Sequence, residues 1–237
     1  MSIIRLAMMV SGGGTTAKYV FKACSSGGEL HGLVQPVCLI ASAEDIGAIK
    51  RLDKAGFKGK VFICNPRELG KNLGGALCQE MDDCEVDWFG QYGWLPMTPS
   101  VVINNFHGIN QHPAPVPYFG GRGMYSRAPH AAVIEFSRLA KRQVCTEATA
   151  QLVAPEYDRG AIIAYTTMLV FPEDTVESLQ QRLLPLEWQT QVTALKRIAQ
   201  NGGNPPMPLE SDFELLPGEK KLLEEAKRMA REQYPRG

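Results

Sequence analysis

Short apolar runs alternate with longer segments of mixed polarity along most of the chain. Runs of about four to eight apolar residues are typical of buried strands, whereas apolar residues spaced three or four positions apart are typical of helices. This pattern predicts strands at 3–10, 36–42, 60–64, 86–93, 106–112, 146–154 and 161–170. It predicts helices at 17–24, 44–56, 67–82, 130–140 and 174–200, with a short helical turn around 98–104.

The alternation of strands and helices predicts an α/β fold built on a doubly wound, mainly parallel sheet. The composition changes after the sequence NGGNPP at 201–206, and in the tail a segment at 218–234 interleaves Glu and Lys with apolar residues. That spacing predicts an amphipathic helix. We therefore expect one main domain over 1–200 and a C-terminal helical extension over 201–237, rather than a second domain.

The overall composition is typical of a soluble protein with a substantial core. The chain has 237 residues, of which 44% are hydrophobic and 21% charged, and its formal net charge is zero. This balance gives no basis for binding nucleic acid or an anionic membrane surface. No apolar run approaches the roughly 20 residues of a membrane span, and the first residues lack the layout of a signal peptide. We expect a cytoplasmic protein that is a monomer or a homodimer.

The cysteines and histidines give no sign of a metal site. The six cysteines show no CxxC spacing, and the four histidines do not supply ligand pairs at the usual separations. Cys38 and Cys64 lie in apolar runs, where a free thiol behaves as a small hydrophobic side chain. We therefore expect reduced, structural cysteines and no bound metal.

A glycine-rich loop with the sequence SGGGTT, residues 11–16, connects the first predicted strand to the first predicted helix. Backbone N–H groups and the positive end of the helix dipole favour an anion at such a position. The loop matches neither the G-x-G-x-x-G pattern nor a Walker A sequence. Two interpretations remain open: a phosphate site made by Gly13, Gly14, Thr15 and Thr16, or a tight turn with threonine caps.

Three side chains of complementary chemistry stand near the ends of predicted strands. Asn110 and His112 are two positions apart, so an extended strand places them on the same face, and Pro113 ends the ladder because it lacks an N–H. Asp158 precedes a glycine and an apolar run, where a loop would lead into another strand. Together these groups can hold an attacking amine, move its proton and stabilise an oxyanion. The alternatives are a satisfied strand-end histidine and an aspartate that caps a turn.

With these motifs placed, the sequence resembles the formyltransferase superfamily, and within it the phosphoribosylglycinamide formyltransferases. The family's N-x-H-P signature stands at 110–113, and its D-x-G-x-(I/V)-(I/L) signature stands at 158–163. The loop at 11–16 corresponds to its S-G-x-G-S-N loop, and 174–187 follows its D-T-x-x-x-L…R…E helix pattern. The resemblance covers roughly residues 2–200, and the paired N-x-H-P and D-x-G motifs are its most specific part.

The resemblance implies a Rossmann-like formyltransferase domain that transfers a formyl group from 10-formyltetrahydrofolate to the amine of glycinamide ribonucleotide in purine biosynthesis. Asn110 would hold the formyl oxygen and the oxyanion, His112 would polarise or shuttle protons at the tetrahedral centre, and Asp158 would accept the proton of the amine and orient the imidazole. The 11–16 loop would hold the phosphate, and Glu187 would lie near the ribose. The folate would lie against Tyr92, Gly93, Trp94, Leu95, Val153 and Ala154.

The sequence also departs from the family pattern in ways that leave the acceptor open. Thr16 stands where the family usually has Asn, Gln151 stands where a His commonly precedes the D-x-G loop, and the stretch 118–130 is longer than the usual linker. His130 is expected to open the helix at 130–140. The alternatives are a formyltransferase acting on another amine such as a sugar nucleotide, a formyl-folate hydrolase, or a non-catalytic nucleotide-binding protein. A methionyl-tRNA formyltransferase is disfavoured, because the extension is short for a tRNA-binding domain and the chain is not basic.

Overall fold

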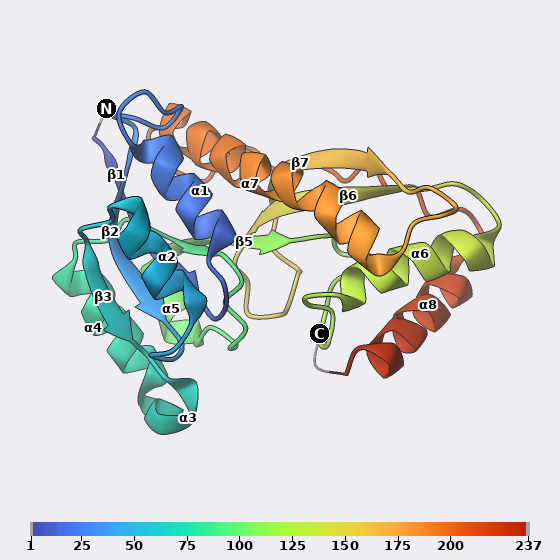
Figure 1. The fold of residues 1–237 in the computed structure, drawn as a ribbon, viewed down its shortest axis with the longest axis horizontal. Coiled ribbons are helices and arrows are strands. Elements are labelled where there is room, and N and C mark those ends of the chain that lie inside the picture. Colours follow the sequence, from blue (N-terminus) through green and yellow to red (C-terminus); the bar gives the residue numbers. More distant parts are fainter. Residues whose placement is uncertain (1, 236–237) are drawn as a thin grey trace.

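The computed structural model describes residues 2–235, and its strands form one seven-stranded sheet (Figure 1). The strands are β1 (Ile4–Val10), β2 (Val34–Ala41), β3 (Lys60–Ile63), β4 (Trp88–Gln91), β5 (His107–His112), β6 (Cys145–Leu152) and β7 (Ile162–Leu169). Their order across the sheet is β3-β2-β1-β4-β5-β6-β7. Strands β1 to β5 run parallel, whereas β6 is antiparallel to β5 and to β7. The predicted α/β fold with a mainly parallel sheet is confirmed.

The helices form layers on both faces of this sheet. They are α1 (Thr15–Cys24), α2 (Gly47–Ala55), α3 (Pro66–Leu69), α4 (Leu73–Asp83), α5 (Ser100–Asn105), α6 (Ala128–Ala140), α7 (Val176–Gln200) and α8 (Lys220–Gln233). Helices α1, α2 and α7 pack on one face of the parallel half, and α4 and α5 pack on the other. Helices α6 and α8 lie side by side near β6 and β7 (Figure 1). Since α7 contacts α1, β6, β7 and α6, this long helix connects the two halves of the molecule.

Strand β1 shows why the predicted strands are so uniformly apolar. Its side chains alternate between two faces, and helices cover both faces. Leu6 and Met8 belong to the apolar cluster made with α1, α2 and α7, whereas Ala7 and Met9 belong to the cluster made with α4 and α5. All four side chains are fully buried. From Leu6 to Val10 neither face of this strand meets water, so the sequence shows a continuous apolar run there instead of an alternating one.

Two predicted helices differ from the structure. The prediction of one helix over 67–82 is wrong, because α3 and α4 are separated by a 3-10 turn at Gly70–Asn72. Gly70 has φ 50° and ψ −120°, a conformation that glycine adopts readily and that no right-handed helix contains. The helix predicted at 130–140 begins earlier, at Ala128, so His130 lies inside its first turn and does not open it.

The C-terminal extension folds back onto the rest of the chain, and its predicted amphipathic helix is confirmed as α8. Leu223, Ala226 and Ala230, which share one face of α8, pack into an apolar cluster with α6. Before the helix, the backbone N–H of Leu209 donates to the carbonyl oxygen of Ile162 in β7 at 2.9 Å. The last part of the predicted extension, 236–237, lies outside the described residues. Within residues 2–235, no helix combines the length and the apolar character that crossing a membrane requires.

Burial of Leu77 generates a prediction about stability. This side chain of α4 is fully buried in the cluster that contains Ala7 and Met9. We expect Leu77→Ala to lower the free energy of unfolding by about 2–5 kcal/mol, because it removes apolar contacts and leaves a cavity. Urea denaturation followed by circular dichroism measures the change. A loss smaller than about 1 kcal/mol would contradict the tight packing of α4 on the sheet.

Candidate active site

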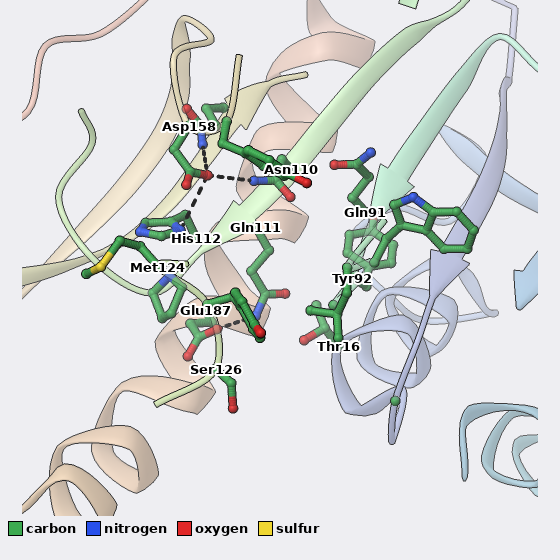
Figure 2. Close-up of a pocket in the computed structure, with 18 of the residues that line it drawn as sticks. Thr16, Gln91, Tyr92, Asn110, Gln111, His112, Met124, Ser126, Asp158 and Glu187 are labelled. Carbon is green, nitrogen blue, oxygen red and sulfur yellow. Dashed lines mark hydrogen bonds and ion pairs between the residues drawn. The ribbon is translucent and has the colours of Figure 1, made fainter. Parts of the chain in front are cut away.

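The carboxyl ends of β1, β4 and β5 meet at one cavity of about 620 Å³. In a doubly wound sheet, ligands bind at this edge, where the loops that follow the strands diverge. Figure 2 shows Asn110, His112 and Asp158 on one side of the cavity, with Thr16 and Tyr92 on the opposite side. Every residue that the sequence indicated for the site lines this cavity: Gly13, Gly14, Thr15, Thr16, Tyr92, Gly93, Trp94, Leu95, Asn110, His112, Val153, Ala154, Asp158 and Glu187.

The carboxylate of Asp158 lies at the centre of a hydrogen-bond network (Figure 2). Its Oδ1 accepts hydrogen bonds from Asn110 Nδ2 at 3.2 Å and from Gln151 Nε2 at 2.9 Å. Its Oδ2 accepts one from the backbone N–H of Gly121 at 2.9 Å. His112 Nδ1 lies 3.4 Å from Oδ1. Hydrogen bonds to a charged acceptor are stronger than neutral ones, so these donors fix the carboxylate in one orientation.

Two glycines allow the loop that carries Asp158 to reach this position. Asp158 itself has φ +55°, in the left-handed region that aspartate tolerates better than most residues. A Cβ on Gly160 would lie 1.7 Å from the carbonyl oxygen of Leu152, and one on Gly120 would lie 2.4 Å from the Cβ of Asp158. The glycine of the D-x-G motif is therefore required by the packing of this loop on β6, and Gly120 by the close approach of Asp158.

His112 is held between two hydrogen-bond acceptors. It is only 3% exposed, its Nε2 lies 3.1 Å from the carbonyl oxygen of Phe119, and its Nδ1 faces the carboxylate of Asp158. Both partners are hydrogen-bond acceptors, so they hold the ring in one orientation with Nδ1 toward the carboxylate. His112 is thus both a satisfied strand-end histidine and part of the cavity wall.

Asn110 keeps one hydrogen-bond donor free for a ligand. Its amide nitrogen carries two hydrogens, of which one is used on Asp158. The other is available to an oxygen atom in the cavity. Gln151, where the family commonly has a His, replaces a titratable neighbour with a fixed amide donor to Asp158. The Oε1 of Gln151 is buried and has no hydrogen-bond partner in the part of the chain that the structure describes.

The glycine-rich loop forms the N-terminal end of α1 on the opposite side of the cavity. Gly14 has φ +67° just before the helix, and a Cβ there would lie 2.5 Å from the Cβ of Ala48. Within residues 2–235 no side chain caps α1, which does not support the alternative of threonine caps and leaves the first N–H groups open to a ligand. A Cβ on Gly13 would lie 3.8 Å from a guanidinium nitrogen of Arg51, so a positive charge stands beside the loop. Both features favour an anion.

Glu187 of α7 enters the cavity from a third direction. It is 5% exposed, and its carboxyl group accepts a hydrogen bond from Gln111 Nε2 on β5 (Figure 2). Burial raises the pKa of Glu187 from 4.5 to about 7, and the hydrogen bond from Gln111 offsets this only in part. A carboxyl group that is partly protonated near neutral pH can both donate to and accept from the hydroxyl groups of a ligand.

A second imidazole lines the same cavity. His130, in the first turn of α6, is 1% exposed, and its burial together with the nearby His112 lowers its pKa to about 3. His130 is therefore neutral at physiological pH. Its Nδ1 has no hydrogen-bond partner within residues 2–235. The cavity thus combines one imidazole that faces a carboxylate with another that stays uncharged.

The turn after β4 forms a largely apolar wall of the cavity. Tyr92 and Trp94 are 4% and 6% exposed, whereas Leu95 is 53% exposed at the mouth. Ser11 braces this turn, since its N–H donates to the carbonyl oxygen of Gly93 at 3.0 Å and its hydroxyl oxygen accepts from the N–H of Leu95 at 3.2 Å. The glycine-rich loop and the apolar wall are therefore held together. The buried Tyr92 hydroxyl and Trp94 Nε1 have no partner among the described residues.

The first part of the motif at 174–187 fixes the start of α7, and only its later residues, among them Glu187, line the cavity. Thr175 and Ser178 form a reciprocal capping box, in which each side chain accepts from the backbone N–H of the other residue. The carboxylate of Asp174 accepts from Arg182 at 2.5 Å and from Ser178 at 2.8 Å. These contacts orient the helix that carries Glu187 into the site.

Several groups that shape the site were not identified from the sequence. The carbonyl oxygen of Phe119 and the N–H of Gly121 are backbone atoms, and the double glycine at 120–121 is the one sequence signal that could have pointed to them. Pro235 lines the cavity from the end of the extension, which no local pattern indicated. Among residues 2–235, no group of three or more His, Cys, Asp or Glu side chains is placed to hold a metal ion.

A doubly wound sheet with a glycine-rich loop and an imidazole–carboxylate pair at its carboxyl edge defines a Rossmann-like protein with a ligand cleft at the switch point. The chain belongs to the formyl transferase family, whose sequence profile matches residues 4–195. It is 31% identical over 199 residues to the chloroplastic phosphoribosylglycinamide formyltransferase of Arabidopsis thaliana, covering 83% of this chain and 65% of that relative. It is 25% identical over 194 residues to the phosphoribosylglycinamide formyltransferase of Haemophilus influenzae, covering 81% and 85%.

The fold agrees with solved structures. Glycinamide ribonucleotide transformylase 1 from Symbiobacterium toebii superposes with a TM-score of 0.73 at 20% sequence identity, covering 88% of this chain and 95% of that one. A likeness at this level of identity shows the fold. The chain spans 65% of the length of the plant relative, and helix α8 lies beyond the residues that the family profile matches.

The raised pKa of Glu187 predicts a pH-dependent loss of stability. In the unfolded chain this carboxyl group releases its proton near pH 4.5, and in the folded chain near pH 7. Between these pH values the folded chain therefore keeps a proton that the unfolded chain has released. The stability that this proton confers is therefore lost as the pH rises from 4.5 to about 7. We expect Glu187→Gln to become more stable relative to the parent protein across this range. Thermal denaturation of both proteins as a function of pH measures the difference, and parallel curves would contradict it.

Proposed function

We propose that the protein transfers the formyl group of 10-formyltetrahydrofolate to the amine of glycinamide ribonucleotide, a reaction of purine biosynthesis. The observation that carries this proposal is the convergence of Asn110, His112 and Asp158 on a cavity whose opposite side is an anion-binding helix terminus. The names of the relatives from Arabidopsis thaliana and Haemophilus influenzae support the same reaction. The tetrahydrofolate donor enters as a second substrate.

In this reaction the amine nitrogen forms a bond to the formyl carbon, and the bond from that carbon to the folate nitrogen breaks. Asn110 donates its free amide hydrogen to the formyl oxygen as negative charge develops there. His112, which lies on the same face of β5, polarises the tetrahedral centre with its imidazole ring. Asp158 orients that ring and accepts the proton that the amine loses, directly or through water. The same proton is then passed to the folate nitrogen as its bond to the formyl carbon breaks.

The hydrogen bonds of Asp158 leave one of its oxygens able to take up the proton. Its Oδ1 accepts from Asn110 and Gln151, whereas its Oδ2 accepts only from the N–H of Gly121 and keeps a lone pair. Asn110 holds the carboxylate with one amide hydrogen while its other amide hydrogen donates to the oxyanion. Gln151 and Gly121 meanwhile keep the carboxyl group in place.

The opposite side of the cavity suits the ribonucleotide. The open N–H groups of α1 and the hydroxyls of Thr15 and Thr16 hold the phosphate, and the guanidinium of Arg51 lies close enough to Gly13 to add a favourable charge. Glu187, which is partly protonated near neutral pH, holds the ribose hydroxyls. The amine of the acceptor is thereby directed toward Asp158.

The apolar wall suits the flat ring of the folate. Tyr92 and Trp94 line the cavity there, and aromatic side chains pack well against a flat heterocyclic ring. Val153 and Ala154 line the cavity next to the Asp158 loop. The donor would therefore lie between the turn after β4 and the end of β6, with its formyl group toward Asn110.

An assay with defined substrates tests this function. Purified protein is mixed with 10-formyltetrahydrofolate and glycinamide ribonucleotide, the release of tetrahydrofolate is followed by absorbance, and the formylated product is identified by mass spectrometry. We expect release that depends on the ribonucleotide. Release without any amine would instead indicate a hydrolase, and release only with an amino-sugar nucleotide would indicate another acceptor. Failure to bind either ligand would indicate a non-catalytic protein.

The proposed roles predict large losses of turnover for two substitutions. We expect Asp158→Asn and His112→Ala each to slow turnover at least ~100-fold, because each removes an acid–base group from the reacting centre. His107→Ala is the matched control, since His107 lies at the other end of β5 and is exposed. Steady-state kinetics with circular dichroism of each variant measures the effect. Turnover within about threefold of the parent protein in both site variants would contradict the acid–base roles of Asp158 and His112.

The phosphate site predicts a loss of affinity for the acceptor. Gly14→Ala introduces a Cβ that would lie 2.5 Å from the Cβ of Ala48, so the loop must move and its N–H groups lose their alignment. We expect the KM for the ribonucleotide to rise about tenfold or more, with a smaller effect on the KM for the folate. Gly27→Ala is the control, because Gly27 also has a positive φ (+82°) but no atom lies within 4 Å of its added Cβ. Equal KM values for these two variants would argue against the site.

A further inference from the structure

The C-terminal extension lies against the catalytic side of the cavity, although it follows the residues matched by the family profile, 4–195. Helix α8 runs along α6, the helix whose first turn carries His130 (Figure 1). Pro235, just after α8, is part of the cavity lining. The extension is therefore in a position to act on the site, and its contacts show how.

Polar contacts anchor the extension at two points. Glu147 on β6 is fully buried, and its Oε1 accepts hydrogen bonds from the hydroxyl of Ser211 at 2.8 Å and from the N–H of Asp212 at 2.9 Å. Arg142, just after α6, donates two hydrogen bonds to the carboxylate of Glu219 at 2.7 and 2.8 Å. A buried carboxylate requires such donors, so the segment around Ser211 is fixed to the sheet. The residue between these anchors that reaches inward is Phe213.

Phe213 packs among three aromatic rings. Its ring centroid lies 5.1 Å from that of Tyr118, 5.0 Å from that of Phe119 and 5.6 Å from that of Phe136. Two of these partners belong to the loop that precedes α6, and the third belongs to α6 itself. Phe213 is only 6% exposed. The extension thus supplies an aromatic side chain that holds the loop against α6.

The same loop makes two of the contacts that fix the catalytic pair. The carbonyl oxygen of Phe119 faces His112 Nε2 at 3.1 Å, and the N–H of Gly121 donates to Asp158 Oδ2 at 2.9 Å. The loop backbone is intrinsically adaptable, because Gly121 and Gly123 have φ values of +105° and +81°. Its geometry therefore depends on what packs around it.

Helix α8 supports the second half of this loop. A Cβ on Gly123 would lie 3.0 Å from the Cδ of Arg231, so the aliphatic part of that side chain lies directly on the loop backbone. Lys227, one turn earlier on α8, is 8% exposed, and burial lowers its pKa. The loop is thus enclosed by Phe213 on one side and by α8 on another.

We propose that the C-terminal extension is a positioning element of the active site, and that Phe213 is a positioning residue acting through Phe119 on the pair His112 and Asp158. Phe213 fixes the Phe119 backbone, whose carbonyl oxygen holds His112 Nε2 and thereby directs Nδ1 toward the carboxylate. The positioning does not depend on which amine is formylated, whereas its effect on turnover rests on the proposed function.

Two substitutions of Phe213 test this proposal against a remote control. Phe213→Ala removes the ring, Phe213→Leu keeps part of its volume, and Leu77→Ala removes buried apolar contacts in a separate cluster around α4. The full chain is used, at a temperature where circular dichroism shows every variant folded. The first measurement is the NMR spectrum of the histidine ring protons, which needs no substrate. The chain has four histidines, so comparison with His112→Ala assigns the His112 signal.

We expect Phe213→Ala to shift and broaden the His112 signal while the signals of His31 and His107 stay in place. Phe213→Leu should give a smaller shift in the same direction, and Leu77→Ala should give none. In the assay, Phe213→Ala should lower kcat about tenfold or more, with the KM for the ribonucleotide within about threefold of the parent value, because the catalytic pair is misplaced while the phosphate site is intact. The kcat of Phe213→Leu should lie between that of Phe213→Ala and that of the parent protein.

Other results would overturn the proposal. One is a His112 signal in Phe213→Ala that matches the signal in Leu77→Ala, and another is a loss of kcat without any change in that signal. If Phe213→Ala does not fold, an unshifted His112 signal in the folded Phe213→Leu protein overturns it. If the His112 signal shifts as expected but no formyl transfer is seen with any variant or with the parent protein, the proposed function is wrong and the positioning role stands.

Discussion

The buried carboxylate of Asp158 is the group on which the rest of the site depends. A carboxylate removed from water requires hydrogen-bond donors, and here they come from three separate segments: Asn110 at the end of β5, Gln151 in β6 and Gly121 in the loop before α6. Satisfying one side chain therefore brings together parts of the chain that are far apart in sequence. The same convergence produces the cavity and directs His112 into it.

The two sides of the cavity present different chemical groups to a ligand. The side that suits an anion consists of backbone N–H groups at the start of α1, exposed because Gly14 has no side chain. The side that suits proton transfer consists of side chains whose orientation is fixed by hydrogen bonds to neighbouring loops. Both sides are attached to parallel strands that helices cover on each face, so their separation is set by the most rigid part of the molecule. The proposed chemistry needs that separation, since the phosphate and the reacting amine of one ligand must be held at the same time.

Much of this was predictable from sequence, and the limits have physical causes. Apolar runs such as 3–10 located the strands because both faces of the sheet are buried, and the alternation of Asn110 and His112 placed both on one face. Glycine at 160 was recognisable within a motif, whereas the break at Gly70 depends on one backbone angle that the surrounding helical pattern concealed. The carbonyl oxygen of Phe119 could not be found, because every residue has a carbonyl and only the tertiary fold selects this one. The pKa of Glu187 likewise follows from burial that no local pattern encodes.

The presence of Pro235 in the wall of the cavity has a practical consequence. Ile4 begins β1 at the edge of the sheet away from the cavity, since the cavity lies at the carboxyl ends of the parallel strands. A fluorescent label attached at Pro235 would occupy space beside a bound ligand, so its emission would report on binding but would also disturb it. A label at Ser2 would extend from the opposite edge of the sheet and would leave the cavity free.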